Sequence, residues 1–190
     1  DALTDEGHEV VVYDSKKSNW LKGNQSMIVG DILDDRLREA IEGCEVVYNF
    51  AALADLNKAL NLPVETVNIN ILGNVKALEY SRQAEVKRFI YASSVYVFSR
   101  EGGFYRCSKE ASENYVEEYK EAFDLDYTIL RFGSLYGPRS GEDNGIYRII
   151  KTAIKENKIS YEGNPESIRE YIHVLDAANA SVRAMGEEFK

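Results

Sequence analysis

The sequence is poor in the residues that cross-link a chain or anchor it in a membrane. It has only 2 cysteines and 2 histidines among 190 residues, too few for a disulfide framework. It also has no G-x-S-x-G motif, which argues against a Ser-His-Asp hydrolase. No segment reaches the run of about 18 apolar residues that a membrane span requires, and residues 1–6 do not form a signal peptide. We expect a cytoplasmic protein with free thiols and no bound metal.

Positive charge is also scarce. The net charge of −9 makes nucleic acid and anionic membranes poor partners, since both attract clustered lysine and arginine. The remaining composition, with 44% apolar and 29% charged residues, is that of a globular chain with one sizeable core.

Short apolar runs alternate with helical patterns along the chain. The runs have the length of buried strands and comprise residues 10–14, 27–31, 46–51, 88–93 and 127–132. Asp34 stands where a helix N-cap is expected, ahead of a helix that ends at Gly43. Two longer helices carry apolar residues at helical spacing: Val67, Ile71, Val75 and Leu78 in one, and Tyr115, Val116, Tyr119 and Phe123 in the other. This order predicts an α/β fold with a doubly wound, Rossmann-like parallel sheet.

A glycine-rich phosphate loop is missing. Neither G-x-G-x-x-G nor G-x-x-G-x-x-G occurs, although a doubly wound domain carries such a loop after its first strand. We therefore expect a fragment that lacks this strand and loop and is inactive alone. Residues 1–138 are expected to form a truncated dinucleotide-binding domain and 139–166 to begin a substrate-binding part. Residues 167–190 are expected to return to the sheet, with the C-terminal remainder missing.

Tyrosine and lysine recur at a spacing of four, in the pairs Tyr13/Lys17, Tyr105/Lys109 and Tyr147/Lys151. On a helix this spacing puts both side chains on one face, where an ammonium group lowers the pKa of a phenol. Composition alone gives about one such pair by chance. Only Tyr105/Lys109 follows a strand that ends in serine, at Ser94. We interpret this trio as a site that moves a proton on or off the hydroxyl of a carbinol.

These features belong to a longer series of motifs in fixed order. The segments are 10–14, 30–32, 50–53, 70–73, 91–94, 105–109, 135–139 and 169–176. In this order they resemble the extended short-chain dehydrogenase/reductases, the group of NAD-dependent nucleotide-sugar epimerases and dehydratases, and most of all the UDP-glucose 4-epimerases. The resemblance implies NAD as cofactor and a nucleotide sugar as substrate. It also implies a homodimer formed through the helix of Tyr105 and a second helix.

The resemblance assigns the catalytic and substrate roles. Tyr105 is the general acid/base, and Lys109 lowers its pKa and binds the nicotinamide ribose. Ser94 orients the sugar hydroxyl. Arg169 binds the substrate diphosphate, which suits a guanidinium group. Ser134 binds substrate at a position where many relatives carry asparagine.

The resemblance also assigns the cofactor contacts. Asp14 would accept hydrogen bonds from the adenosine ribose and favour NAD over NADP, whereas Lys16 and Lys17 can pair with a 2′-phosphate. The adenine is expected beside Asp31 and Ile32. The cofactor is expected to cross a small-residue strand end formed by Ala51, Ala52 and Leu53. Asn70 lies on an otherwise apolar helix face and is expected to bond backbone near the catalytic segment.

Two departures from the family pattern bear on the reaction. Ser94 and Tyr105 are 11 residues apart, whereas relatives insert a longer loop over the substrate, so the lid must be short. Val95 and Tyr96 stand where 4,6-dehydratases carry the acidic pair that eliminates water. We therefore expect a 4-epimerase that oxidises C4 transiently. The alternatives are an NAD(P)-dependent reductase or dehydrogenase of the same fold, and a non-catalytic dinucleotide-sensing module.

Overall fold

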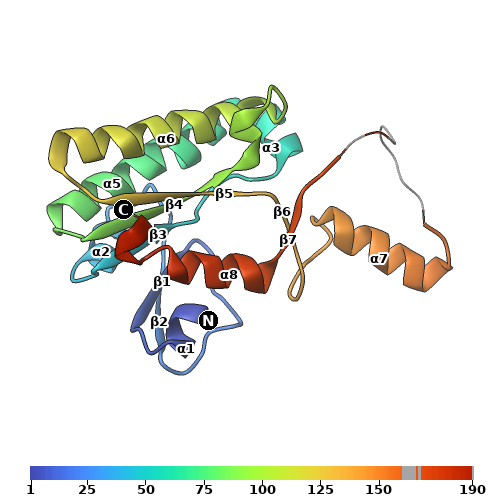
Figure 1. Cartoon of the computed structure of the whole chain (residues 1–190), viewed down its shortest axis with the longest axis horizontal. Coiled ribbons are helices and arrows are strands. Elements are labelled where there is room, and N and C mark those ends of the chain that lie inside the picture. Colours follow the sequence, from blue (N-terminus) through green and yellow to red (C-terminus); the bar gives the residue numbers. More distant parts are fainter. Residues whose placement is uncertain (160–165, 167, 190) are drawn as a thin grey trace.

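The strands of the computed structural model pair in parallel throughout (Figure 1). The structure describes residues 1–159, 166 and 168–189. The strands are β1 (Val10–Asp14) paired with β2 (Gln25–Val29), then β3 (Val46–Asn49), β4 (Arg88–Ser94) and β5 (Tyr127–Phe132) in one sheet, and β6 (Ser134–Tyr136) paired with β7 (Tyr171–His173). Each of the five predicted runs overlaps a strand, which confirms an α/β fold with parallel strands.

Two strands end two residues earlier than the apolar runs predict. After β2, the Asp31 carboxylate accepts a hydrogen bond from the Leu33 N–H at 2.9 Å and turns the chain. After β3, the Asn49 side-chain oxygen accepts a hydrogen bond from the Ala51 N–H at 3.2 Å. In both places a polar side chain takes a backbone group that a longer strand would have paired.

The sheet is interrupted. Within the described residues, β1–β2 and β3–β4–β5 are separate sheets, and no strand pairing joins β1 to β3. The predicted doubly wound sheet is therefore found in these residues only as separate parallel sheets.

Helices cover both faces of the β3–β5 sheet (Figure 1). On one face, α2 (Leu37–Ile41), α5 (Gly73–Gln83) and α6 (Gly103–Phe123) enclose a core that includes buried Leu78, Phe89 and Val116. On the other face lies α8 (Val174–Arg183), where the Tyr48 hydroxyl donates to the Ser181 carbonyl at 2.9 Å. The remaining helices are α1 (Ala2–Asp5), α3 (Leu56–Asn61), α4 (Pro63–Thr66), a π-helical segment (Val67–Leu72), α7 (Gly145–Glu156), and 3-10 turns at Val95–Phe98 and Glu187–Phe189.

The predicted cap of α2 is wrong. The helix begins at Leu37, with Arg36 before it. The Asp34 carboxylate instead accepts hydrogen bonds from the Asp31 N–H at 3.2 Å and from the Arg36 side chain at 3.0 Å. Asp34 therefore stabilises the turn after β2 and leaves the helix start without a side-chain cap.

The predicted buried faces of the two long helices are also partly wrong. Val67, Tyr115 and Phe123 are about half exposed, at 50%, 45% and 52%. The buried side of α6 is mostly polar and consists of Ser108, Lys109, Ser112, Glu113 and Val116. The facing π-helical segment and α5 present buried Asn70 and Asn74, so hydrogen bonds join these helices to α6 in addition to apolar contacts.

Two kinds of feature are absent from the described part of the chain. None of its helices is long and apolar enough to cross a membrane. No cluster of three or more His, Cys, Asp or Glu side chains there could hold a metal ion.

Candidate active site

Ser94 and Tyr105 meet at the start of α6. A 3-10 turn (Val95–Phe98) follows Ser94, and the chain then reverses at Gly102 and Gly103. Both glycines have positive φ angles, of 90° and 51°, a conformation that side chains disfavour. The reversal brings the Tyr105 hydroxyl within hydrogen-bonding reach of the Ser94 side chain.

Lys109 lies one turn further along α6 and is only 2% exposed. Its ammonium group donates to the Ala92 carbonyl at 2.7 Å. The same nitrogen lies 4.7 Å from the centre of the Tyr91 ring and 5.8 Å from the centre of the Tyr105 ring. Burial lowers the pKa of Lys109 to about 8, and the Glu113 carboxylate opposes this shift. The phenol and the ammonium group therefore share one face of the helix.

The hydroxyl of Tyr105 is harder to ionise than a free phenol. Burial raises the pKa of Tyr105, the hydrogen bond with Ser94 opposes the rise, and the neighbouring Tyr96 adds to it. The phenol is therefore protonated at neutral pH in this structure. To act as a base it needs further stabilisation of the phenolate, and the Lys109 cation is placed to supply part of it.

Asn70 connects the end of β3 to α6 from within the π-helical segment. Its side-chain oxygen accepts from the Leu53 N–H at 2.7 Å, and its amide group donates to the Ser108 hydroxyl at 2.8 Å and the Leu53 carbonyl at 3.2 Å. The Ser112 hydroxyl donates to the Asn70 carbonyl at 2.8 Å. Asn70 does bond backbone, as expected, but the backbone is that of Leu53 after β3, and its contact with the helix of Tyr105 is to the Ser108 side chain. Single π turns of this kind are frequent at functional sites.

An ion pair between a buried carboxylate and an exposed arginine lies behind Lys109. Glu113 is 6% exposed and stands one turn after Lys109 on the same face of α6. It accepts two hydrogen bonds from Arg131 of β5, at 2.7 Å from Nη2 and 3.0 Å from Nε. The Arg131 guanidinium lies 4.9 Å from the centre of the Phe98 ring, in the turn after Ser94. The pair thus connects the helix of the lysine to the segment that follows the serine.

The residues assigned to the cofactor lie at the carboxyl ends of parallel strands, where open α/β sheets bind ligands. Asp14 ends β1, Asp31 and Ile32 follow β2, and residues 51–53 follow β3. Asp14 and Ala51 are exposed. The Asp14 carboxylate is therefore accessible to a ribose, and the small side chain of Ala51 lets a ligand come close to the backbone. This edge fits a dinucleotide. No hydrogen bond recorded for the described residues joins Asp14 or Asp31 to the catalytic trio.

Arg169 reaches the neighbourhood of the trio from a distant segment. Its Nη1 donates to the Tyr96 hydroxyl at 3.4 Å, and the Tyr96 ring stands edge-on to the Tyr105 ring at 6.4 Å between centres. Ser134 begins β6, and its backbone N–H donates to the carbonyl of Glu170 at 2.9 Å. Ser134 therefore lies beside the segment of Arg169 and is half-buried.

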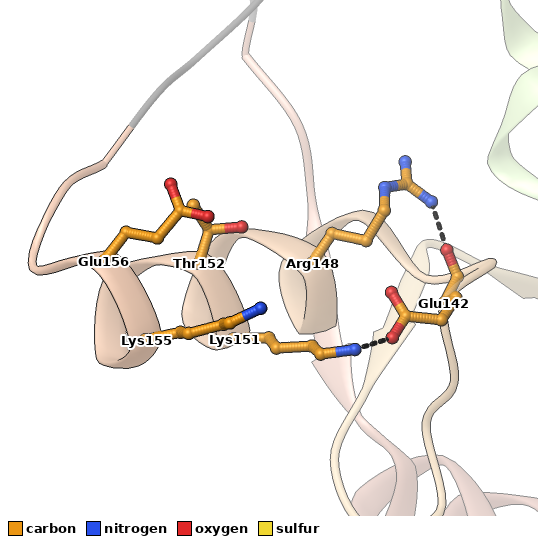
Figure 2. A pocket seen from close by; sticks show the side chains of 6 residues that line it. All are labelled: Glu142, Arg148, Lys151, Thr152, Lys155 and Glu156. Carbon is orange, nitrogen blue, oxygen red and sulfur yellow. Dashed lines mark hydrogen bonds and ion pairs between the residues drawn. The ribbon is translucent and has the colours of Figure 1, made fainter.

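The pair Tyr147/Lys151 lies on α7, apart from this cluster. An open hollow of about 210 Å³ on that helix is lined by charged and polar side chains (Figure 2), namely Glu142, Arg148, Lys151, Thr152, Lys155 and Glu156. Lys151 is paired with Glu142, and its nitrogen lies 5.9 Å from the centre of the Tyr147 ring. Both Lys151 and Glu142 are exposed, so this pair lacks the burial that changes the pKa of Lys109.

The order of motifs and the geometry point to one known group of proteins. The sequence model of the NAD dependent epimerase/dehydratase family matches residues 1–189. The chain belongs to this family. The family resemblance drawn from the sequence is therefore confirmed, and its members act on nucleotide sugars.

Members of the epimerase/dehydratase family resemble the chain in sequence and fold. A putative UDP-glucose 4-epimerase of Methanocaldococcus jannaschii is 26% identical over 207 residues, which cover 97% of this chain and 68% of that protein. The UDP-glucose 4-epimerase of Thermotoga maritima, solved with UDP-glucose, gives a TM-score of 0.87 at 26% identity and covers 96% of this chain and 67% of that one. The UDP-glucose 4-epimerase of Thermus thermophilus, solved with NAD, gives a TM-score of 0.81 at 26% identity and covers 96% of this chain and 68% of that one. The chain thus spans about two thirds of the length of each.

Three residues of this family member's site were not identified as site residues from the sequence. Glu113 had a usable signal, because it stands four residues after Lys109 and so lies on the same helical face. Arg131 and Tyr96 had no such signal in the sequence. Their contacts with Glu113 and Arg169 depend on how β5, α6 and the segment before β7 come together in space.

The buried lysine makes the stability of the chain depend on pH. An unfolded lysine titrates near 10.5, whereas the folded pKa is about 8. Between these values the unfolded chain binds the extra proton, so the contribution of Lys109 to stability rises with pH. Lys109→Met removes this contribution. We expect the free energy of unfolding of the variant, relative to wild type, to fall by up to about 3 kcal/mol from pH 8 to pH 10.5.

Urea unfolding at several pH values measures this difference. Lys58→Met, which replaces an exposed lysine of α3, is the matched control and is expected to give a difference that does not change with pH. A constant difference for Lys109→Met as well would mean that the lysine is not buried in solution.

Proposed function

We propose that these residues form the catalytic part of an NAD-dependent nucleotide-sugar 4-epimerase. The observation that carries the proposal is the cluster of Ser94, Tyr105 and buried Lys109 at the carboxyl end of β4. Membership of the epimerase/dehydratase family supports it, as do relatives named UDP-glucose 4-epimerases. Val95 and Tyr96 follow Ser94, so an acidic pair for eliminating water is absent there and epimerisation is favoured over dehydration.

In the proposed reaction Tyr105 acts first as general base and then as general acid. Its phenolate oxygen takes the proton of the sugar 4-hydroxyl, while the Ser94 hydroxyl holds that group in place. The Lys109 ammonium stabilises the phenolate electrostatically. When bound, NAD would supply the hydride acceptor for C4 and the hydride donor for its return. Once the keto sugar has turned its other face, Tyr105 gives the proton back to the C4 oxygen, and the 4-epimer forms without net oxidation.

We assign the cofactor to the carboxyl edge of the strands. Asp14 is proposed to bind the adenosine ribose, Lys109 and Tyr105 the nicotinamide ribose, and the adenine and diphosphate to lie along Asp31, Ile32, Ala51, Ala52 and Leu53. The exposed Asp14 carboxylate favours NAD, because it repels the 2′-phosphate of NADP. Structures of relatives with bound NAD support this choice of cofactor.

We assign the substrate to the side of the trio that Arg169 approaches. Its guanidinium is proposed to bind the diphosphate, since its planar donors match phosphate oxygens. Ser134 is proposed to hydrogen-bond the sugar from the neighbouring segment. A solved relative with UDP-glucose supports a uridine diphosphate sugar as substrate.

We further propose that the active unit contains more chain than these 190 residues. The relatives extend beyond the part that this chain covers, and among the residues that the structure describes, which leave out 160–165 and 167, no strand joins the sheets of β1 and β3. In this scheme residues 1–138 contribute the dinucleotide-binding part, 139–166 begin the substrate-binding part, and 167–190 return to the sheet. The projection of α7 away from the sheets (Figure 1) is consistent with that division.

We also propose a homodimer through the outer faces of α5 and α6. Leu72, Tyr115 and Phe123 are exposed apolar side chains on these helices or at their ends, and burying such surface favours association. Sedimentation velocity of the wild type and of Phe123→Lys tests this proposal. A wild-type monomer at high micromolar concentration contradicts it.

A reductase of the same fold is the second candidate. It is favoured by the short connection between Ser94 and Tyr105, because a small lid allows the keto sugar or the reduced cofactor to leave. The two functions differ in cofactor use. An epimerase returns each hydride, whereas a reductase consumes one cofactor molecule for each product molecule.

The decisive assay incubates the protein with UDP-glucose or UDP-galactose and a catalytic amount of NAD. We expect the 4-epimer to exceed the NAD present, with no net change in nicotinamide absorbance. The 190-residue chain alone is expected to give no turnover, and the comparison is made with the longest form of the protein. One-for-one release of NADH without any 4-epimer would reject the epimerase proposal in favour of a dehydrogenase.

A further inference from the structure

Tyr96 touches three parts of the proposed site, yet it has no step in the proposed reaction. Its backbone N–H donates to the Ser94 hydroxyl oxygen at 3.3 Å. Its ring stands edge-on to the Tyr105 ring, with an angle of 86° between the planes. Its hydroxyl accepts a hydrogen bond from Nη1 of Arg169, which lies 73 positions away in the sequence. Ser94, Tyr105 and Arg169 therefore all contact one residue, the first through its backbone and the other two through its side chain.

The ring of Tyr96 is fixed independently of Arg169. A Cβ atom at Gly102 would lie 3.1 Å from the Tyr96 Cγ, so the reversing backbone packs directly on the ring. The Tyr96 carbonyl accepts from both the N–H and the hydroxyl of Ser99, at 3.0 Å and 3.2 Å. Both contacts belong to the turn that also carries Tyr105 into α6. The hydroxyl of Tyr96 is thus a rigid acceptor, whereas the Arg169 side chain is long, exposed and flexible.

From this geometry we propose that Tyr96 is a positioning residue that holds the Arg169 guanidinium at a set distance from the phenol of Tyr105. The inference rests on the proposed function, in which Arg169 binds the diphosphate and Tyr105 moves the proton. A nucleotide sugar then has two fixed points of attachment, its diphosphate at Arg169 and its reacting hydroxyl at Tyr105. Tyr96 thereby selects substrates whose reacting hydroxyl lies at that distance from the diphosphate.

Tyr96→Phe tests the role of the hydroxyl, because it leaves the ring, the backbone N–H and the glycine turn in place. The affinity of the 190-residue chain for UDP, measured by calorimetry, is expected to fall about 3–10-fold, the effect of losing one exposed hydrogen bond of ordinary net strength. In an Arg169→Ala background the same substitution is expected to have no effect, because no guanidinium remains to be held. Tyr127→Phe, at the amino end of β5 and so at the opposite end of that strand from Ser94, is the matched control and is expected to bind UDP like the wild type.

The outcomes separate this inference from the proposed function. Equal UDP affinities of the wild type and Tyr96→Phe, or an undiminished loss in the Arg169→Ala background, would overturn the positioning role. If the wild-type chain does not bind UDP, the substrate assignment fails for this chain. NMR then tests the hydrogen bond between Arg169 and the Tyr96 hydroxyl directly. The side-chain ¹H–¹⁵N resonance of Arg169, assigned with Arg169→Lys, is then compared between the wild type and Tyr96→Phe. A shifted resonance supports the positioning role, and an unchanged one overturns it.

Discussion

Tyr105→Phe is expected to lower turnover about 10²–10⁴-fold, the usual contribution of a general acid/base. The substitution keeps the ring beside Tyr96 and Lys109 and removes only the hydroxyl that Ser94 contacts. Because the packing is retained, the free energy of unfolding is expected to change by less than about 1 kcal/mol. The measurements are the epimerisation rate of the longest form of the protein, with UDP-glucose at catalytic NAD, and a urea unfolding curve.

Tyr147→Phe is the matched control for this experiment. Tyr147 also has a lysine four residues later on a helix, but that lysine is exposed and paired with Glu142. A wild-type rate is therefore expected. If Tyr105→Phe kept a near-normal rate while Tyr147→Phe lost it, the general acid/base would have been assigned to the wrong pair.

Asn70→Ala is expected to lower the free energy of unfolding by about 3 kcal/mol or more. The substitution leaves the N–H and the carbonyl of Leu53, and one bond of the Ser108 hydroxyl, without their partner. Each buried polar group left unsatisfied costs about 1–3 kcal/mol. The lost hydrogen bonds connect the strand end proposed for the cofactor with the helix of Tyr105. We therefore expect both segments to become less ordered together. Urea unfolding measures the energy.

Asn61→Ala provides the control for Asn70→Ala. Asn61 ends α3, is exposed, and donates only to the Asn57 carbonyl within the same helix, at 2.8 Å. We expect a change within about 0.5 kcal/mol. A similarly small effect at Asn70 would show that water replaces its partners and that the amide does not connect the two segments in solution.

Strands and helices were largely predictable because apolar runs and helical spacing are local signals. The buried face of α6 could not be predicted from these local signals. Tyr115 and Phe123 are apolar and correctly spaced, yet they are exposed, while Ser108 and Ser112 are buried because they bond Asn70 across the helix pair. A polar contact between helices 38 or more positions apart leaves no periodic trace in either one.

The candidate site also combines residues that local patterns predict with contacts that they do not. The trio of Ser94, Tyr105 and Lys109 could be proposed from a strand end and one helical spacing, both of them short-range features. The meeting of Tyr96 with Arg169 depends on the return of the chain before β7, which no local pattern predicts. The missing glycine-rich loop, by contrast, predicts a sheet without its first strand, and β1 and β3 do not pair within the described residues.

The glycine pair at the start of α6 lets the lid and the catalytic residues change independently. Gly102 and Gly103 perform the reversal with their own backbone angles, so the geometry of Tyr105 does not depend on the number of residues before them. Loop closure becomes only slowly more costly with length, and adding about ten residues after Phe98 costs about 1 kcal/mol. Insertions at this point are thus a low-cost route by which an enzyme of this kind can acquire new substrate preferences during evolution while its proton-transfer chemistry stays the same.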